Sequence, residues 1–251
     1  MSQQFREKLI AGHLLVGTMI TLDSAVTAEL LASAGFDWFF VDAEHSSMTP
    51  PGIQRVLQGA GADMPCLVRL EATAGVPVKK ALDAGAAGII APMVNTAQEA
   101  AAVVQWAKYA PMGTRGVGLS RAHGYGLGFQ TYLDNANEET AVVVQAEHID
   151  AVNNIEAIIQ VPGVDAVLIG PYDLSASLGR LGELQHPEVV GAIDHVTAVC
   201  RAAKIPLGIF GVSATAVKPY IERGYTLIVA GVDTLLLGLA AQKLIAQIRE
   251  Q

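Results

Sequence analysis

The chain of 251 residues contains little cysteine. Cys66 and Cys200 are its only two cysteines, and they form no Cys-x-x-Cys motif. The sequence therefore predicts two thiols in the protein core and a reducing, cytoplasmic environment. The first residues, MSQQFREKLIAG, lack the apolar region of a signal peptide, which agrees with a cytoplasmic location.

Charge and long apolar runs are also scarce. No cluster of Lys and Arg marks a nucleic-acid surface, and the net charge is -8. No apolar run reaches the roughly 18 to 20 residues that span a bilayer. Only 16% of residues are charged while 51% are hydrophobic, which predicts that additional surface is buried in a homo-oligomer. A large α/β core is the other explanation for part of this composition.

One pattern recurs along the chain: a glycine that closes a helix, a short apolar run, and then a polar or Gly/Pro break. It occurs at 34–42, 84–92, 162–170 and 223–231. Further apolar runs lie at 14–20, 65–70, 141–147 and 206–210. Apolar runs without alternation are typical of parallel strands that are buried on both faces. The sequence thus predicts eight strands.

Helical stretches separate these strands, for example 24–34, 96–109 and 187–203. TAQE at 96–99 is a capping box, and Pro187 suits a first helical turn. Eight β-α units in one domain, residues 1–251, predict an α/β fold of the (β/α)8 TIM barrel type. A doubly wound sheet is the competing fold, but the chain has neither G-x-G-x-x-G nor G-x-x-x-x-G-K-[ST]. The Gly-rich segment 110–136 is expected as a loop on the active-site face.

Polar residues at the carboxyl ends of barrel strands are typically catalytic. Glu147 and Asp173 follow two neighbouring strands, and two adjacent carboxylates repel unless a cation or proton lies between them. Their oxygen ligands suit Mg²⁺ or Mn²⁺, with water and substrate completing the shell. The alternative is that Asp173 only caps the next helix.

His45 follows another strand, three residues after Asp42. We expect Asp42 to orient the imidazole, so that His45 acts as a base. The alternative is a structural histidine. Glu44 is expected to point the other way, where a solvated salt bridge would account for it.

Arg69 ends an apolar strand, and a buried arginine needs an anion. Its partner could be Glu71 or Asp42, or a bound carboxylate or enolate. All lysines fall in predicted helices or before strands, which argues against Schiff-base chemistry. No G-x-S-x-G motif marks a serine nucleophile. A cation, a histidine base and an arginine together suit proton abstraction next to a carbonyl group.

Several stretches resemble the HpcH/HpaI aldolase family, the class II pyruvate aldolases related to the citrate lyase β subunit. They include FDWFFVDAEHSS, CLVRL, PMGTRGVGLSRAHGYG, VVVQAEHIDAVNNIEAI and VPGVDAVLIGPYDLSASLG, in the family's order and over nearly the whole chain. The resemblance implies a barrel enzyme that cleaves 4-hydroxy-2-keto acids to pyruvate, or a related 2-keto acid, and an aldehyde. It also implies a last helix that swaps with a neighbouring subunit, in hexamers built as trimers of dimers.

The resemblance further implies roles for individual residues. Glu147 and Asp173 would bind Mg²⁺ or Mn²⁺, with Co²⁺ as a further candidate. His45 with Asp42 would form the base, and Arg69 would stabilise the enolate. The other residues expected at the substrate are Gln145, Gly170, Pro171, Tyr172, Asp173, Phe210, Ser120 and Arg121.

The chain departs from the family pattern in two places. EHSSMTP replaces the usual small residue and proline after EH, and the SRAHGYG segment also differs. These departures leave the aldehyde open. Two alternatives remain: a lyase that acts on malyl-CoA or citryl-CoA thioesters, and a non-catalytic barrel that binds a keto acid.

Overall fold

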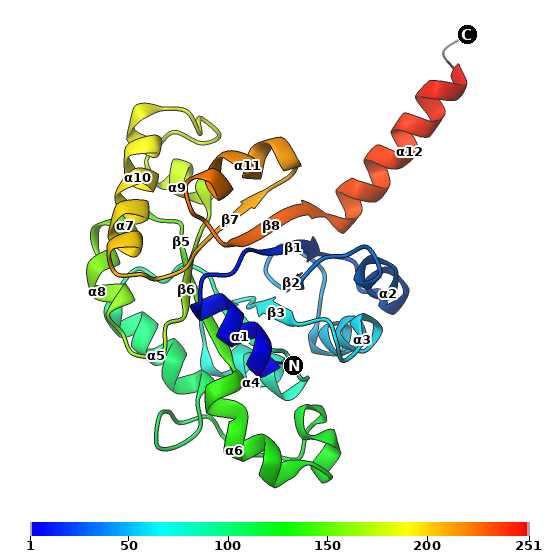
Figure 1. Cartoon of the computed structure of the whole chain (residues 1–251), viewed down its shortest axis with the longest axis vertical. Coiled ribbons are helices and arrows are strands. Elements are labelled where there is room, and N and C mark those ends of the chain that lie inside the picture. The colour runs from blue at the N-terminus through cyan, green and yellow to red at the C-terminus, as the bar shows by residue number, and fades with distance from the viewer. Residues whose placement is uncertain (1, 250–251) are drawn as a thin grey trace.

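The computed structural model describes residues 2–249. Within them, eight parallel strands close into a barrel in chain order, with β8 paired to β1 (Figure 1). The strands are β1 Leu15–Ile20, β2 Trp38–Asp42, β3 Cys66–Arg69, β4 Gly88–Ala91, β5 Ala141–Ala146, β6 Ala166–Ile169, β7 Leu207–Gly211 and β8 Leu227–Val232. This arrangement confirms the predicted (β/α)8 barrel.

Helices alternate with the strands and, apart from α12, lie around the barrel (Figure 1). They are α1 Ser2–Ile10, α2 Ala25–Ala32, α3 Pro50–Ala60, α4 Gly75–Asp83, α5 Ala97–Ala107, α6 Phe129–Glu139, α7 Ile149–Asn153, α8 Ile155–Ile159, α9 Pro171–Ser177, α10 Pro187–Ala202, α11 Ala214–Glu222 and α12 Asp233–Arg249. The capping box at Thr96 and the Pro187 helix start are both present.

The recurring glycines have the geometry that their position requires. Gly35, Gly85, Gly163 and Gly224 have φ values of +91°, +97°, +98° and +89°. This left-handed region is costly for residues with a Cβ atom, so glycine is favoured where the chain leaves a helix and enters the next strand. The sequence pattern therefore located β2, β4, β6 and β8.

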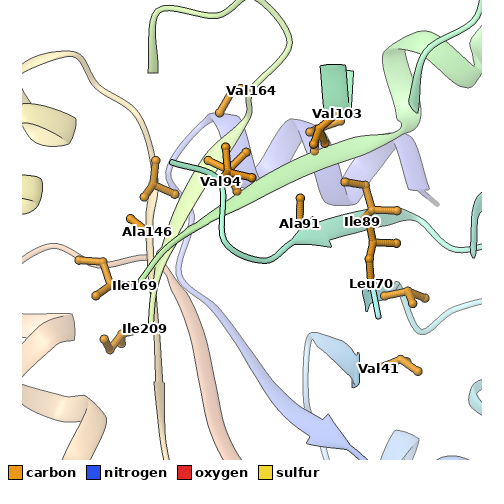
Figure 2. Close-up of a cluster of buried hydrophobic side chains, with 14 of the residues drawn as sticks. Val41, Leu70, Ile89, Ala91, Val94, Val103, Ala146, Val164, Ile169 and Ile209 are labelled. Atoms are coloured by element: carbon orange, nitrogen blue, oxygen red, sulfur yellow. The ribbon is translucent and has the colours of Figure 1, made fainter. Parts of the chain in front are cut away.

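Two apolar layers follow from the alternation of side chains along each strand. Phe39 and Val41 of β2 point outward and belong to the layer between strands and helices, which Figure 2 shows around Ile89. Trp38 and Phe40 belong to the barrel interior. Phe5 of α1 is buried in that interior cluster, with its ring centroid 6.0 Å from that of Trp38. The barrel is thus a packed core rather than a pore.

The placement predicted for segment 110–136 was wrong. The segment follows α5 rather than β4, so it lies at the amino-terminal end of the barrel, and its second part forms α6. The Arg121 Nη1 donates a 2.7 Å hydrogen bond to the carbonyl of Ala84, just before β4. Ser120 and Arg121 therefore lie near the amino-terminal ends of the strands, away from the carboxyl ends where the active site is expected.

The last helix, α12, extends away from the barrel (Figure 1). Asp233 is its buried residue, whereas Leu237, Leu244 and Ile248 are exposed by 60% or more. Within residues 2–249, no helix is both long enough and apolar enough to cross a membrane.

Candidate active site

A cavity of about 500 Å³ opens at the carboxyl ends of the strands. Of the residues predicted from the sequence, it brings together Asp42, His45, Arg69, Gln145, Gly170, Pro171, Tyr172, Asp173 and Phe210. Glu147, Ser120 and Arg121 are not among the residues that line it. Arg121 lines a different pocket, beside the amino-terminal ends of β3 and β4.

Arg69 and Asp42 form a buried ion pair between neighbouring strands. The pairing of β2 with β3 sets the two residues side by side. Arg69 donates from Nε and Nη2 to the two Asp42 oxygens, at 2.9 and 2.7 Å. The guanidinium also lies over the Phe40 ring, 5.1 Å from its centroid. Nη1 of Arg69 forms no hydrogen bond with the described residues, so this nitrogen can donate to a substrate oxygen.

Asp42 also organises the loop after β2. Its Oδ1 accepts the backbone N–H groups of Glu44 and His45 at 3.0 and 3.3 Å. Burial raises the pKa of Asp42, but the hydrogen bonds and charge of Arg69 and these two N–H groups outweigh it, and the net pKa is lowered. The carboxylate is therefore ionised at neutral pH, and both of its oxygens already accept hydrogen bonds.

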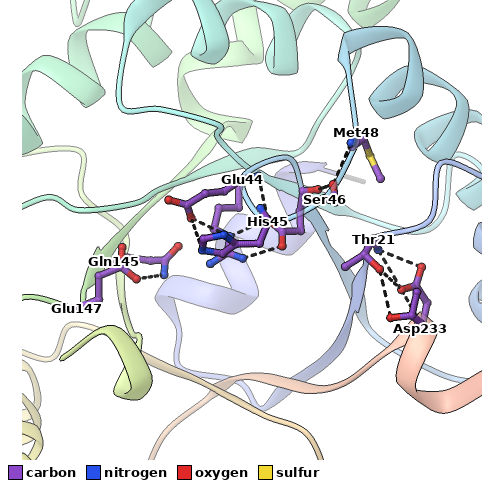
Figure 3. Close-up of polar contacts among 11 residues, drawn as sticks. Thr21, Glu44, His45, Ser46, Met48, Gln145, Glu147 and Asp233 are labelled. Atoms are coloured by element: carbon purple, nitrogen blue, oxygen red, sulfur yellow. Dashed lines mark hydrogen bonds and ion pairs between the residues drawn. The ribbon is translucent and has the colours of Figure 1, made fainter. Parts of the chain in front are cut away.

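The expected contact between Asp42 and the His45 ring was wrong. Asp42 reaches only the backbone of His45, while the ring Nε2 lies 3.7 Å from the Glu44 Oε2 (Figure 3). Glu44 does not point away, as its position suggested, because its Oε2 also lies 3.3 Å from the Arg69 Nε. Burial raises the pKa of Glu44, with Asp42 and Asp173 adding to the effect and Arg69 and His45 opposing it.

Glu147 is buried just past β5. Its Oε1 accepts the backbone N–H of Met93 at 2.8 Å, and its Oε2 accepts from the Gln145 amide (Figure 3). Met93 has φ +52°, a strained value for a residue with a side chain, and this conformation delivers the N–H. The pKa of Glu147 is raised to about 7, mainly by burial, with the Glu44 and Asp173 carboxylates adding to the rise and the Met93 N–H and Arg69 opposing it.

These residues fit a divalent cation. Glu147 and Asp173 offer carboxylate oxygens, and the buried Gln145 Oε1 has no hydrogen-bond partner. Among residues 2–249, no group of three or more His, Cys, Asp or Glu side chains could hold a metal. A cation would therefore rest on two carboxylates, with water and substrate oxygens in the remaining positions. Near neutral pH it would compete with a proton for Glu147.

Several cavity residues were not anticipated. They come from the ends of β1, β2, β6 and β8 and include Met19, Thr21, Leu22, Phe40, Ser46, Ser47, Leu168, Ile169, Val232 and Thr234. Asp233 fixes part of this wall, since it accepts from the Thr21 hydroxyl at 2.7 Å and from the Leu22 N–H at 2.9 Å (Figure 3). The alternation that sends Phe40 and Leu168 inward was the available signal for these two.

Comparison with known proteins places this barrel among enzymes. The profile of the HpcH/HpaI aldolase/citrate lyase family matches residues 16–239. The chain belongs to this family.

Two relatives are each 40% identical to the chain. One is a 4-hydroxy-2-oxo-heptane-1,7-dioate aldolase of Shigella sonnei, aligned over 100% of this chain and 97% of its own. The other is a 4-hydroxy-2-oxovalerate aldolase of Rhodococcus jostii, aligned over 97% and 95%. Among solved structures, a family protein from Burkholderia cenocepacia has a TM-score of 0.95 and 35% identity, covering 99% of this chain and 100% of its own.

Proposed function

We propose that the protein reversibly cleaves 4-hydroxy-2-keto acids to pyruvate, or a related 2-keto acid, and an aldehyde. The observation that carries this proposal is the convergence of the Arg69–Asp42 pair, His45 and Asp173 on one cavity. The two relatives named as aldolases, which align with this chain over nearly its full length, support it. The barrel, residues 1–251, would act as a single catalytic domain.

Glu147 and Asp173 would hold a divalent cation, for which their oxygens favour Mg²⁺ or Mn²⁺, with Co²⁺ as a further candidate. When bound, the cation would draw electron density from the keto group and so acidify the neighbouring C–H bond. Gln145 would hold Glu147 in place through its amide hydrogen bond.

The remaining steps belong to the chain itself. Tyr172 and Asp173, after Gly170 and Pro171, belong to the first turn of α9, where backbone N–H groups have no partner within the helix; these N–H groups would bind the substrate carboxylate. His45 would remove a proton from C3, since its side chain is 64% exposed and can reach a substrate in the cavity. The Nη1 of Arg69 would donate to the enolate oxygen.

The apolar part of the cavity lining favours an uncharged aldehyde. This part of the lining comprises Met19, Leu168, Phe210 and Val232, and Thr234 adds a hydroxyl group to the cavity. Among the described residues that line the cavity, the only basic side chains are Arg69 and His45, and both serve the keto-acid half. Among these described lining residues, a second carboxylate, as in a heptanedioate, finds no further basic side chain to pair with.

Retro-aldol assays that detect released pyruvate test both the reaction and this preference. We expect kcat/KM for 4-hydroxy-2-oxovalerate to exceed that for 4-hydroxy-2-oxo-heptane-1,7-dioate at least about tenfold, the ratio given by 1.4 kcal/mol of unpaired charge. In Val232→Arg, the ratio of the two kcat/KM values should decrease, because the new guanidinium can pair with the second carboxylate. Val26→Arg, at an exposed position on α2, is the matched control. Equal cleavage of both acids would contradict the acceptor assignment. Cleavage of malyl-CoA or citryl-CoA alone would contradict the reaction.

We further propose that the protein is a cytoplasmic homo-oligomer in which α12 packs on a neighbouring subunit, in a hexamer built as a trimer of dimers. The exposed leucines of α12 support an exchanged helix, because a large exposed apolar surface is typical of a protein–protein contact. Two buried thiols, Cys66 and Cys200, support the reducing compartment.

A further inference from the structure

The base of the proposed reaction needs a partner, and Asp42 is not available for that role. Its two oxygens already accept four hydrogen bonds, two from Arg69 and two from backbone N–H groups. The side chain is 1% exposed, so it cannot turn toward His45 without breaking the buried pair. The acid that serves the imidazole must come from another position.

Glu44 occupies that position. Its Oε2 lies 3.7 Å from the His45 Nε2 and 3.3 Å from the Arg69 Nε, so one oxygen atom is shared between the ring and the guanidinium. The Glu44 side chain is 21% exposed and is held by the Arg69 contact, whereas the ring is 64% exposed and free to adjust. A small rotation of the ring would bring Nε2–H into hydrogen-bond range of the carboxylate.

We propose that Glu44 is the positioning residue of the catalytic base, holding the His45 ring through Nε2 so that Nδ1 takes the substrate proton. The inference rests on the proposed function. In this step the C3–H bond breaks, its electron pair remains on the substrate as the enolate, and the proton moves to Nδ1. The imidazolium that forms has the Glu44 carboxylate beside it, and the enolate has Arg69.

The pairing also connects the two halves of the site. Arg69 touches Asp42 and Glu44, so the guanidinium fixes the acid that in turn fixes the base. The charged groups that face this pair are Asp42 and Arg69 from β2 and β3, and Asp173 at the start of α9. Glu147 after β5 adds a further negative charge.

The test is Glu44→Gln, which keeps the side-chain shape and an oxygen for Arg69 but removes the charge. We expect kcat for exchange of the pyruvate methyl protons with D₂O to fall about tenfold, a part of the roughly 10²- to 10⁴-fold that a positioned acid–base group supplies. KM for pyruvate should stay within about twofold, because Glu44 acts on the base and not on the substrate. Glu71→Gln, an exposed glutamate after β3, is the matched control and should change neither constant.

A second readout separates this inference from the proposed function. ¹⁵N NMR of the imidazole in the free protein reports its tautomer, and we expect mainly Nε2–H in the wild type and a mixture in Glu44→Gln. A rise in KM at unchanged kcat would assign Glu44 to substrate binding through Arg69. An unaltered tautomer in Glu44→Gln would show that Glu44 does not hold the His45 ring. Either result overturns the inference. If wild-type protein exchanges no protons, the proposed function fails, while the tautomer still decides the Glu44–His45 pairing.

Discussion

Replacing Arg69 with alanine should lower the turnover of 4-hydroxy-2-keto acid cleavage about 10²- to 10³-fold, the usual effect of losing one charge-stabilising donor. The reason is that Arg69 lines the cavity and its Nη1 is left to donate to the substrate, while Nε and Nη2 are anchored on Asp42. Arg69→Lys should recover little of this loss, because an ammonium group cannot bind Asp42 in the bidentate manner and also reach the substrate. Steady-state kinetics of pyruvate release would measure both variants.

The same replacement should also destabilise the protein. Asp42 would remain buried without its partner, and breaking a buried pair in this way costs about 3–5 kcal/mol. Urea denaturation would measure the loss, with Arg180→Ala as the control. Arg180 pairs with Glu188 at the surface, where an ion pair contributes about 0–1 kcal/mol. Unchanged turnover in folded Arg69→Ala would remove Arg69 from the mechanism.

Replacing Gly170 with alanine should weaken the binding of the cation about 10- to 100-fold, as expected when a group that orients a ligand is disturbed. An added Cβ would lie 2.6 Å from the Glu147 Oε2 and 2.9 Å from the Glu147 Cβ. The carboxylate would have to move away from the Met93 N–H and the Gln145 amide that hold it. Gly170 has φ -99°, which alanine adopts freely, so the effect would come from the side chain and not from the backbone.

Titration with Mn²⁺, followed by the EPR signal of the free ion, would test this prediction. Gly191→Ala is the matched control, because an added Cβ there, in α10, meets no atom within 4 Å. Binding to the wild type should be weaker at pH 6 than at pH 8, since a proton occupies Glu147 below its pKa of about 7. Wild-type affinity in folded Gly170→Ala would show that Glu147 is not a ligand.

The sign of the Glu147 shift also concerns stability. A carboxyl group whose pKa is raised in the folded state stabilises the fold at pH values below its pKa in the unfolded chain. For Glu147 this contribution is lost as the pH rises through its folded-state pKa of about 7. Without a cation, Glu147 therefore favours folding at acidic pH. A bound cation would reverse this trend, because it binds the ionised form.

The fold could be predicted from the sequence because parallel strands are buried on both faces and their helices end in glycine. Gly35 and Gly85 mark such ends, and their positive φ values explain why other residues are disfavoured there. The strand ends then supplied Asp42, Arg69 and Asp173, since the carboxyl ends of all strands meet at one mouth. The placement of segment 110–136 on the active-site face was avoidable. Helix 96–109 was predicted, and in a strictly alternating barrel a segment that follows a helix lies at the opposite end.

Side-chain direction in the loop after β2 was the part that spacing could not predict. Asp42 and His45 are three residues apart, which implies a shared face only in a helix. Here the chain leaves a strand, and the Asp42 carboxylate accepts backbone N–H groups in a turn, so the ring is directed to Glu44 instead. Such a turn depends on Arg69, which lies 27 residues away in sequence and fixes the carboxylate.

The most direct test of the whole account is exchange of the pyruvate methyl protons in D₂O, followed by NMR, with Mg²⁺ or Mn²⁺ and with EDTA. It measures enolate formation without any knowledge of the aldehyde. We predict exchange that requires the divalent cation and is lost in His45→Ala. Absence of exchange with every metal, or equal exchange in His45→Ala, would contradict the assignment of this site as a pyruvate aldolase.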